Sequence, residues 1–218
     1  MTMLKRFGRK VAPAAWILFA AGSAAAAESG PYVGADLGEA LYPQGAYWRP
    51  APGSLLYGNR LDTTDFAWSF RAGYRFSRYF GLDAGYVNLG GYSGALTDRL
   101  NAAAGHGNMS FSAKGETLAA LGTLPLGDWD LHLKAGVLFG DVRLNVSGID
   151  NGALFQTSDT LRTMNRLFGA GAGYDITAHW HAQFDWTRYF KVGSGAESTG
   201  RINGPHIDNL GMGISYRF

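Results

Sequence analysis

Several common features of folded proteins are missing or scarce in this 218-residue chain. Cysteine is absent, which excludes disulfide bonds and thiolate metal sites. Only 17% of the residues are charged. Beyond the N-terminal region, no segment stays apolar for the roughly 20 residues that a membrane-spanning helix needs. The chain therefore has neither the framework of a small disulfide-rich domain nor a transmembrane helix.

The N-terminal region has the order of a secretory signal. Its first ten residues carry four basic side chains, Lys5, Arg6, Arg9 and Lys10. An apolar run from Val11 to Ala21 follows, about half the length of a spanning helix, and small residues from Ala24 to Ala27 come next. Basic, apolar and then small residues are typical of a cleavable signal peptide. We expect residues 1–27 to be removed and residues 28–218 to form one exported domain.

Removing this segment changes the charge balance. The signal contains four of the 19 basic residues and none of the 17 acidic ones, so the mature chain has 15 basic and 17 acidic residues, a net charge of −2. The alkaline pI of the whole sequence therefore belongs to the signal. A basic nucleic-acid surface is not supported, and we expect no nucleic-acid partner.

What the mature chain does have is glycine, aromatic residues and a two-residue hydrophobic period. Glycine accounts for 32 residues and aromatic side chains for 14% of the sequence. Apolar and polar or small residues alternate over 66–76, 181–191 and the C-terminal 209–218. In the last of these, one face carries Leu210, Met212, Ile214, Tyr216 and Phe218. Alternation of this kind predicts strands with two different faces.

The connections between these strands alternate in length, which indicates a membrane barrel rather than a soluble sandwich. Short links are expected near 77–79, 127–129 and 178–180, and long Gly/Ser/Asn/Pro-rich loops over 43–64, 93–108, 148–158 and 193–205. Short turns on one side and long loops on the other are typical of outer-membrane barrels, in which the turns are periplasmic. The polar rows are rich in glycine, as a narrow interior requires.

We therefore predict an all-β fold, an eight-stranded antiparallel up-and-down transmembrane β-barrel over residues 28–218, located in the outer membrane of a Gram-negative cell. The expected strands are 31–42, 65–77, 80–92, 109–126, 130–147, 159–177, 181–192 and 206–218. The apolar faces should contact lipid and the polar faces should line the interior.

With these strands placed, the sequence resembles the transmembrane domain of the OmpA family. The resemblance covers most of the mature chain and is carried by 32–38, 72–76 with 79–86, 171–177 with 184–186, and 208–218. It implies that the C-terminal residues Leu210, Met212, Ile214, Tyr216 and Phe218 are recognised by the barrel-assembly machinery during insertion. It also implies that the peptidoglycan-binding domain common in the family is lacking here, because the chain stops at Phe218.

The family's interior holds an ion-pair network, and the resemblance covers only part of it. Asp83 aligns with one acidic position, whereas uncharged Ala119, Gly173 and Gln183 stand near the positions of its partners. Gating of the family's kind therefore does not carry over in detail.

The strand pattern itself places charged and polar side chains inside the barrel. The expected interior residues are Asp36, Arg71, Arg75, Asp83, His132, Lys134, Gln183, Asp185 and Arg217. Most should be paired, because unpaired charges in a narrow cavity are costly. Two interpretations remain open at this point: a plug of salt bridges that fixes the barrel, or a small water-filled pore whose selectivity these charges set.

Three other patterns were weighed for binding or catalysis. His179 and His181 are two residues apart but lack a third ligand, so we expect no metal site. His206, Asp208 and Ser194 or Ser198 have the residue types of a hydrolase triad without a nucleophile motif, so we expect no catalytic residues. The Gly-rich run 169–173 lacks the strand-then-helix setting of a phosphate loop, so we expect no cofactor.

The functional prediction is a non-enzymatic, monomeric outer-membrane barrel that contributes to envelope structure and presents surface loops, with low conductance at most. Its expected partners are outer-membrane lipid and lipopolysaccharide, and unidentified molecules at loops such as 46–49 and 55–57. The alternatives are a small porin for ions and solutes and, third, a lipid or peptide hydrolase or acyltransferase acting at the rim.

Overall fold

The computed structural model describes residues 29–42, 56–61, 63–98, 105–150, 153–193, 195–197, 200–202 and 204–218. The predicted signal peptide and the aromatic segment 46–49 lie outside these residues. No described helix is long and apolar enough to cross a membrane.

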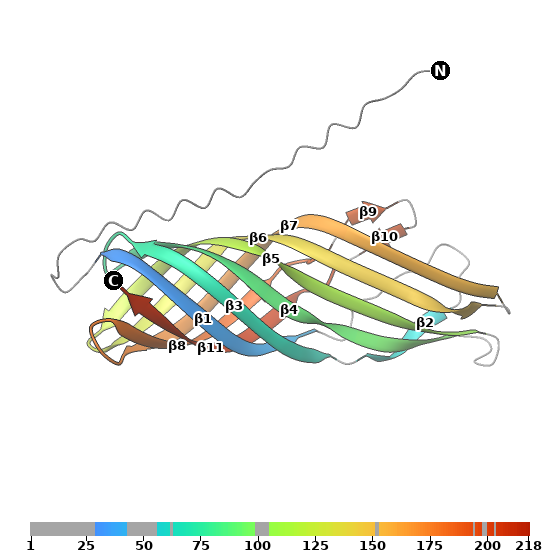
Figure 1. Ribbon diagram of the computed structural model, residues 1–218, viewed down its shortest axis with the longest axis horizontal. Coiled ribbons are helices and arrows are strands. Elements are labelled where there is room, and N and C mark those ends of the chain that lie inside the picture. The colour runs from blue at the N-terminus through green and yellow to red at the C-terminus, as the bar shows by residue number, and fades with distance from the viewer. Residues whose placement is uncertain are drawn as a thin grey trace, which may run out of the picture.

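Eight antiparallel strands form a closed barrel (Figure 1). They are β1 (Gly30–Leu41), β3 (Thr64–Arg75), β4 (Phe80–Asp98), β5 (Gly105–Leu126), β6 (Trp129–Asp150), β7 (Ala153–Asp175), β8 (Trp180–Tyr189) and β11 (Ile207–Arg217). Each strand pairs with the next in the chain, and β1 pairs with β11 over ten residue pairs from Tyr32–Arg217 to Leu41–Asp208. The predicted eight-stranded up-and-down barrel is confirmed.

Three short strands are present besides the eight barrel strands, one of them in the same sheet. β2 (Leu56–Leu61) pairs with the far end of β4, and β9 (Gly195–Glu197) pairs with β10 (Gly200–Ile202). These strands fall in two of the segments predicted as long loops, 43–64 and 193–205.

One end of the barrel, here the short-turn end, holds the three tight connections at the predicted places. Gly127 adopts a φ of +73° between β5 and β6, a conformation that favours glycine. The other two turns are closed by side chains: the hydroxyl of Ser77 accepts from the backbone N–H groups of Tyr79 and Phe80, and that of Thr177 accepts from His179 and Trp180. Local sequence therefore specifies these turns.

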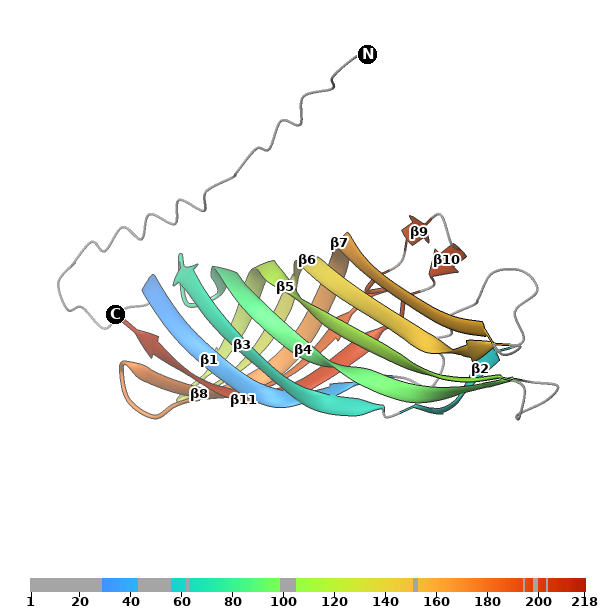
Figure 2. The ribbon, with the colours of Figure 1, turned by 45° about the vertical axis from the view of Figure 1, so that its right-hand side comes forward.

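The opposite, long-strand end departs from the prediction. β4 to β7 are 19 to 23 residues long, so the supposed loops at 93–108 and 148–158 are mostly strand, and that prediction was wrong. Figure 2 shows these four strands running on beyond β8, β11 and β1. Their Gly, Ser and Asn residues suggested loops, but they continue strands whose adjoining inward side chains, at Met109, Phe111, Leu144 and Val146, are apolar and buried.

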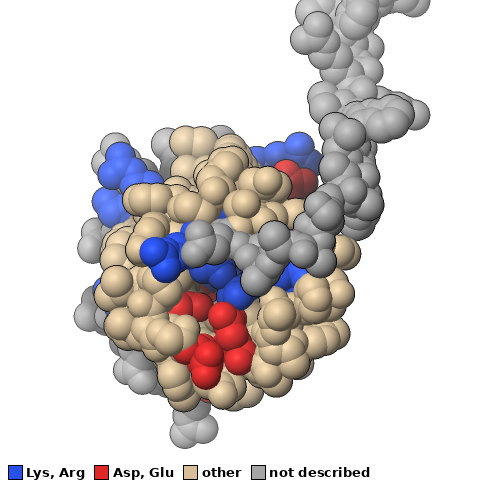
Figure 3. Space-filling model, turned by 90° about the vertical axis from the view of Figure 1, so that its left-hand side faces the viewer, with Lys and Arg blue, Asp and Glu red and all other residues tan. Residues whose placement is uncertain are grey.

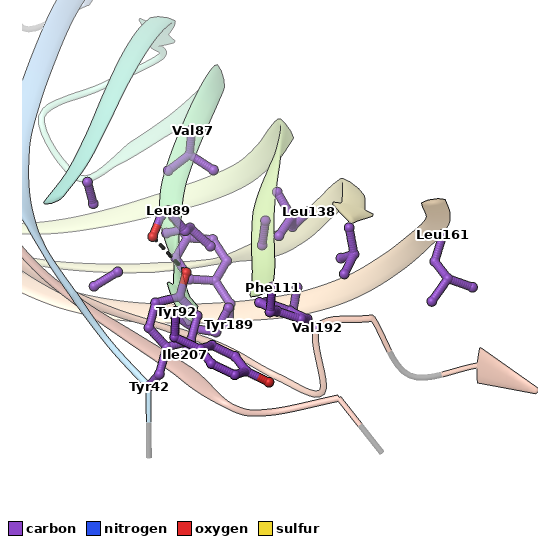
Figure 4. Close-up of a cluster of buried hydrophobic side chains, with 14 of the residues drawn as sticks. Tyr42, Val87, Leu89, Tyr92, Phe111, Leu138, Leu161, Tyr189, Val192 and Ile207 are labelled. Atoms are coloured by element: carbon purple, nitrogen blue, oxygen red, sulfur yellow. Dashed lines mark hydrogen bonds between the residues drawn. The ribbon is translucent and has the colours of Figure 1, made fainter. Parts of the chain in front are cut away.

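The barrel interior therefore has two zones with opposite polarity. Toward the short-turn end it is polar and charged. Toward the long-strand end, buried apolar side chains from all eight barrel strands and the segments beside them form one apolar cluster, which includes Tyr42, Val87, Leu89, Phe111, Leu138, Tyr189, Val192 and Ile207 (Figure 4). The Tyr42 hydroxyl donates to the carbonyl of Leu89 at 2.7 Å, which satisfies the phenol inside this cluster. The expectation of a wholly polar interior is thus corrected for this half.

Candidate functional site

Glycines on β7 make room for the charged side chains of the interior. A Cβ on Gly169 would meet the Lys134 side chain, one on Gly171 the His132 ring, and one on Gly173 the His181 ring. Because β7 has no side chains at these three inner positions, residues of β6 and β8 on either side of it can reach each other across its backbone. The glycines of the run 169–173 thus leave the space that the charged side chains of the interior occupy.

A first group, the turn-end cluster, consists of Asp130, Asp175, His181 and Arg217. Nδ1 of His181 lies 2.7 Å from Oδ1 of Asp175 and 2.9 Å from Nη2 of Arg217, while Nη1 of Arg217 lies 2.8 Å from the same Asp175 oxygen. Nε2 of His181 lies 3.5 Å from Oδ2 of Asp130. Figure 3 views this end of the molecule and shows acidic side chains gathered beside basic ones.

The turn-end cluster also has the donor set of a metal site. Ligand atoms of Asp130, Asp175 and His181 lie within 4.8 Å of one another. Arg217 already supplies a cation to both carboxylates, since its Nη2 lies 4.0 Å from Asp130. The geometry is that of an ion-pair group that covers the short-turn end of the interior.

A second group, the central cluster, surrounds Asp185 on β8. Oδ1 of Asp185 lies 3.1 Å from Nζ of Lys134 and 3.1 Å from Nε2 of His132, and Gln183 donates to Oδ2. The other His132 nitrogen, Nδ1, lies 3.0 Å from Asp130, which joins the central and turn-end clusters. Asp185 is 8% exposed, so this carboxylate depends on its protein partners rather than on water.

A third group extends the network to β1, β3 and β4. Nε of Arg71 lies 3.4 Å from Asp36 and Nη1 lies 3.7 Å from Asp83, distances of ion pairs rather than of short hydrogen bonds. Asp36 also accepts from the Ser69 hydroxyl at 2.7 Å and from Gln183 at 3.1 Å. Gln183 therefore connects this group to the central cluster.

The nine predicted interior residues come from six strands, and the structure brings them together. Eight take part in the three groups just described, and Arg75 lines the same cavity and donates to the carbonyl of Arg78 at 3.5 Å. The space left among them is about 30 Å³, room for roughly one or two water molecules. The arrangement can hold fixed charges in register and fill the lumen.

Asp130, Asp175 and the role of His181 in this network were missed. Asp130 lies two residues before His132 and His181 two residues before Gln183, so the inward alternation was the available signal. The alternation puts His181 on the polar face with Gln183 and Asp185, but it was not among the nine predicted interior residues. The His179 ring instead lies 2.9 Å from the Arg217 carbonyl and stacks on Tyr216, so the two histidines do not form one site.

Substitution of Gly171 tests whether the glycines of β7 are needed to make room for the interior side chains. The Cβ of Gly171→Ala would meet both the His132 ring and the carbonyl of Phe184, so we expect a loss of about 1–3 kcal/mol in unfolding free energy. The matched control is Gly122→Ala on β5, whose Cβ would meet nothing within 4 Å. Urea unfolding of the refolded proteins, followed by tryptophan fluorescence, measures the unfolding free energy of both variants. Equal stability of the two variants would contradict close packing against Gly171.

The outer surface of the barrel is apolar on every side. Each of the eight barrel strands exposes large apolar side chains; Phe70, Leu133 and Met212 are 61%, 55% and 68% exposed. A continuous apolar girdle around a polar interior suits a barrel solvated by lipid. A family model for the outer membrane protein beta-barrel domain matches residues 12–218. The chain belongs to this family.

Solved structures of outer membrane barrels are similar to this chain. OprG from Pseudomonas aeruginosa is 11% identical, with a TM-score of 0.56 over 88% of this chain and 98% of that chain. Neisserial surface protein A is 13% identical, with a TM-score of 0.49 over 87% of this chain and 99% of that chain. At these identities the likeness concerns the fold alone. No curated protein sequence matches the chain.

Membership in the outer membrane barrel family orients the two interior zones. Because the short turns of such barrels are periplasmic, the turn-end cluster lies at the periplasmic mouth and the apolar cluster lies toward the cell exterior. The C-terminal strand β11 faces lipid with Leu210, Met212, Ile214 and Phe218, and Tyr216 packs between Trp180 and Phe218.

The residues considered for catalysis at the extracellular rim are not assembled into a triad within the described chain. Asp208 accepts from Nε and Nη2 of Arg188, each at 2.7 Å, and from the Trp186 indole at 3.1 Å. The His206 ring packs edge-on against Phe190. Ser194 and Ser198 lie outside the described residues.

Proposed function

We propose that this protein is a non-enzymatic, monomeric outer-membrane barrel with a closed interior, similar in role to the transmembrane domain of the OmpA family. It would contribute to envelope structure and present its long extracellular strands to the surroundings. The supporting observation is that two different barriers fill the interior. Paired charges fill the periplasmic half, and the apolar cluster fills the extracellular half.

The two barriers act in series, so neither alone decides conduction. A small porin needs a continuous polar path through the barrel. The charged half leaves about 30 Å³ among its side chains. The apolar half includes side chains that are fully covered, such as Leu89 and Leu138, both 0% exposed. Closure of this kind favours the envelope role over the porin alternative.

Planar-bilayer recording tests the closed interior. We expect the wild-type protein to give no unitary current steps, while a general porin in the same bilayer conducts. Arg71→Ala removes a guanidinium from the charged half but leaves the apolar cluster in place, so this variant should also give no steps. Defined steps from the wild type would establish the porin alternative, and steps from Arg71→Ala alone would show that the apolar cluster is no barrier.

A further inference from the structure

The outward-facing residues of β5, β6 and β7 change from apolar to charged within three consecutive cross-strand rows. On β5 the change lies between Leu118 and Glu116, and on β6 between Phe139 and Asp141. On β7 it lies around Met164, which is flanked by Arg162 and Arg166 on the same face. Lys114 of β5, Asp141 of β6 and Arg162 of β7 are direct cross-strand neighbours. The change therefore marks a line across three strands.

This line lies at the extracellular boundary of the hydrocarbon. On β6 the apolar outward row runs from Trp129 to Phe139, eleven residues that extend about 36 Å along the strand. With the strand tilt of roughly 40° usual in such barrels, this corresponds to an apolar band of roughly 25–28 Å, the height of the hydrocarbon layer they span. Residues just beyond Phe139 are thus at the level of the lipid headgroups of the outer leaflet.

Basic side chains predominate at this level on one side of the barrel. We call Lys114, Arg143, Arg162 and Arg166 the basic band; Glu116 and Asp141 are the acidic residues among them. Arg162 contacts Asp141 at 3.1 Å but is 88% exposed, so solvent screens this pair and the guanidinium stays accessible. The band therefore carries a net positive charge toward the membrane surface.

The opposite side of the barrel differs at the same end. There the described outward side chains of β1 and β11 are acidic at Glu39 and Asp208. The basic residue beside them, Arg188, is held by both oxygens of Asp208. An anionic lipid would accordingly be attracted to one side of the barrel, that of β5 to β7.

Apolar side chains suited to acyl chains lie below Lys114 and Asp141 and between Arg162 and Arg166. Leu118, Phe139 and Met164 are exposed on the lipid side, with Met164 at 70%. A groove of about 450 Å³ runs among Tyr86, Phe139 and Met164 up to Glu116, Asp141 and Arg162. A second groove of about 560 Å³ carries Lys114 and Arg143 together with Asp65 and Asp141. Apolar and basic surfaces thus meet where one amphipathic molecule would contact both.

We propose that the basic band binds the phosphate groups of lipid A, the phosphorylated glycolipid anchor of lipopolysaccharide in the outer leaflet. The guanidinium groups of Arg143, Arg162 and Arg166 match phosphate geometry by offering two parallel N–H donors each. The acyl chains lie along Leu118, Phe139 and Met164. The site depends on the location of the protein in the outer membrane and is independent of whether the interior conducts.

Native mass spectrometry of the detergent-solubilised barrel tests this site. Wild-type protein should retain diphosphorylated lipid A, and the triple variant Arg143→Gln/Arg162→Gln/Arg166→Gln should retain at least roughly tenfold less, since each cation near an anionic lipid surface contributes to binding. The opposite-sign control Glu116→Gln/Asp141→Asn should retain more. Arg78→Gln, at a periplasmic turn, should behave as wild type.

Several results would overturn the site. These are equal retention of lipid A without its phosphates, unchanged binding by the triple variant, or loss of wild-type binding on addition of EDTA, which would assign the contact to metal ions on Glu116 and Asp141. Heat-shifted gel mobility verifies that each variant is folded. If the triple variant does not fold, Arg162→Gln alone carries the test, because this side chain is 88% exposed.

Discussion

Replacement of Asp185 by alanine is expected to destabilise the folded barrel by about 3–5 kcal/mol. The carboxylate is 8% exposed, and Lys134 and His132 both lie 3.1 Å from it. Without Asp185 the Lys134 ammonium would be buried in the interior with its nearest counter-ion removed. Breaking one side of a buried pair costs more than the pair itself contributes, because the remaining charge has lost its solvation.

Urea unfolding of the refolded barrel in lipid vesicles, followed by tryptophan fluorescence, measures this loss. The matched control is Asp208→Ala, which breaks the bidentate pair with Arg188 at the extracellular rim, where the Arg188 side chain is 41% exposed. Water can replace that partner, so the control should lose much less stability. A similar small loss for Asp185→Ala would mean that water reaches the centre of the barrel, and the closed interior would then be wrong.

Leu138→Ala is expected to cost about 2–5 kcal/mol through the cavity that it leaves. Leu138 points inward from β6 and is 0% exposed within the apolar cluster. The neighbouring side chains belong to a closed sheet that cannot collapse far, so lost contacts are only partly recovered. The same urea titration measures the effect.

The control for this variant is Leu133→Ala on the same strand. Leu133 faces outward and is 55% exposed, and lipid can fill the space that the shorter side chain leaves. Its cost should therefore be the smaller of the two. If Leu133→Ala proves the more destabilising variant, the inward apolar cluster does not stabilise the extracellular half as described.

The closed barrel could be predicted because short stretches of sequence specify its strands and turns. A two-residue period fixes which side chains share a face, and the turn residues near Ser77, Gly127 and Thr177 fix where one strand gives way to the next. The even strand number makes the first and last strands antiparallel, and their pairing closes the barrel. The same reasoning placed Arg71 and Asp185 on the inner face.

The long strands and their apolar inner face could not be predicted from the same local signals. In the lipid-covered part of β6 the outward residues Leu131 and Leu133 are apolar and the inward residues His132 and Lys134 are polar. Beyond Phe139 the arrangement inverts, because the outer face meets water there and the inner face must pack. A rule that keeps one face polar for a whole strand fails at the membrane boundary.

The sequence also could not predict which interior side chains pair with each other, because the pairs depend on the register between strands. Asp130 lies opposite Gly173 on β7, and Gly173 lies opposite Gln183 on β8. The His181 ring and the Asp130 carboxylate both lie where a side chain of Gly173 would be, so they approach each other only because this residue has none. Knowing that Asp130 and His181 face inward does not reveal that they meet.

The unequal strand lengths leave β7 with an open edge outside the membrane. Its last pairing with β8 is Leu167–Tyr189, whereas pairing with β6 continues to Ala153. Over residues 153–165 the described chain supplies no second neighbour, so roughly 40 Å of backbone N–H and C=O groups point sideways. A sheet edge of this kind leaves its backbone donors and acceptors to water, so the upper part of β7 depends on β6 alone for its main-chain hydrogen bonds.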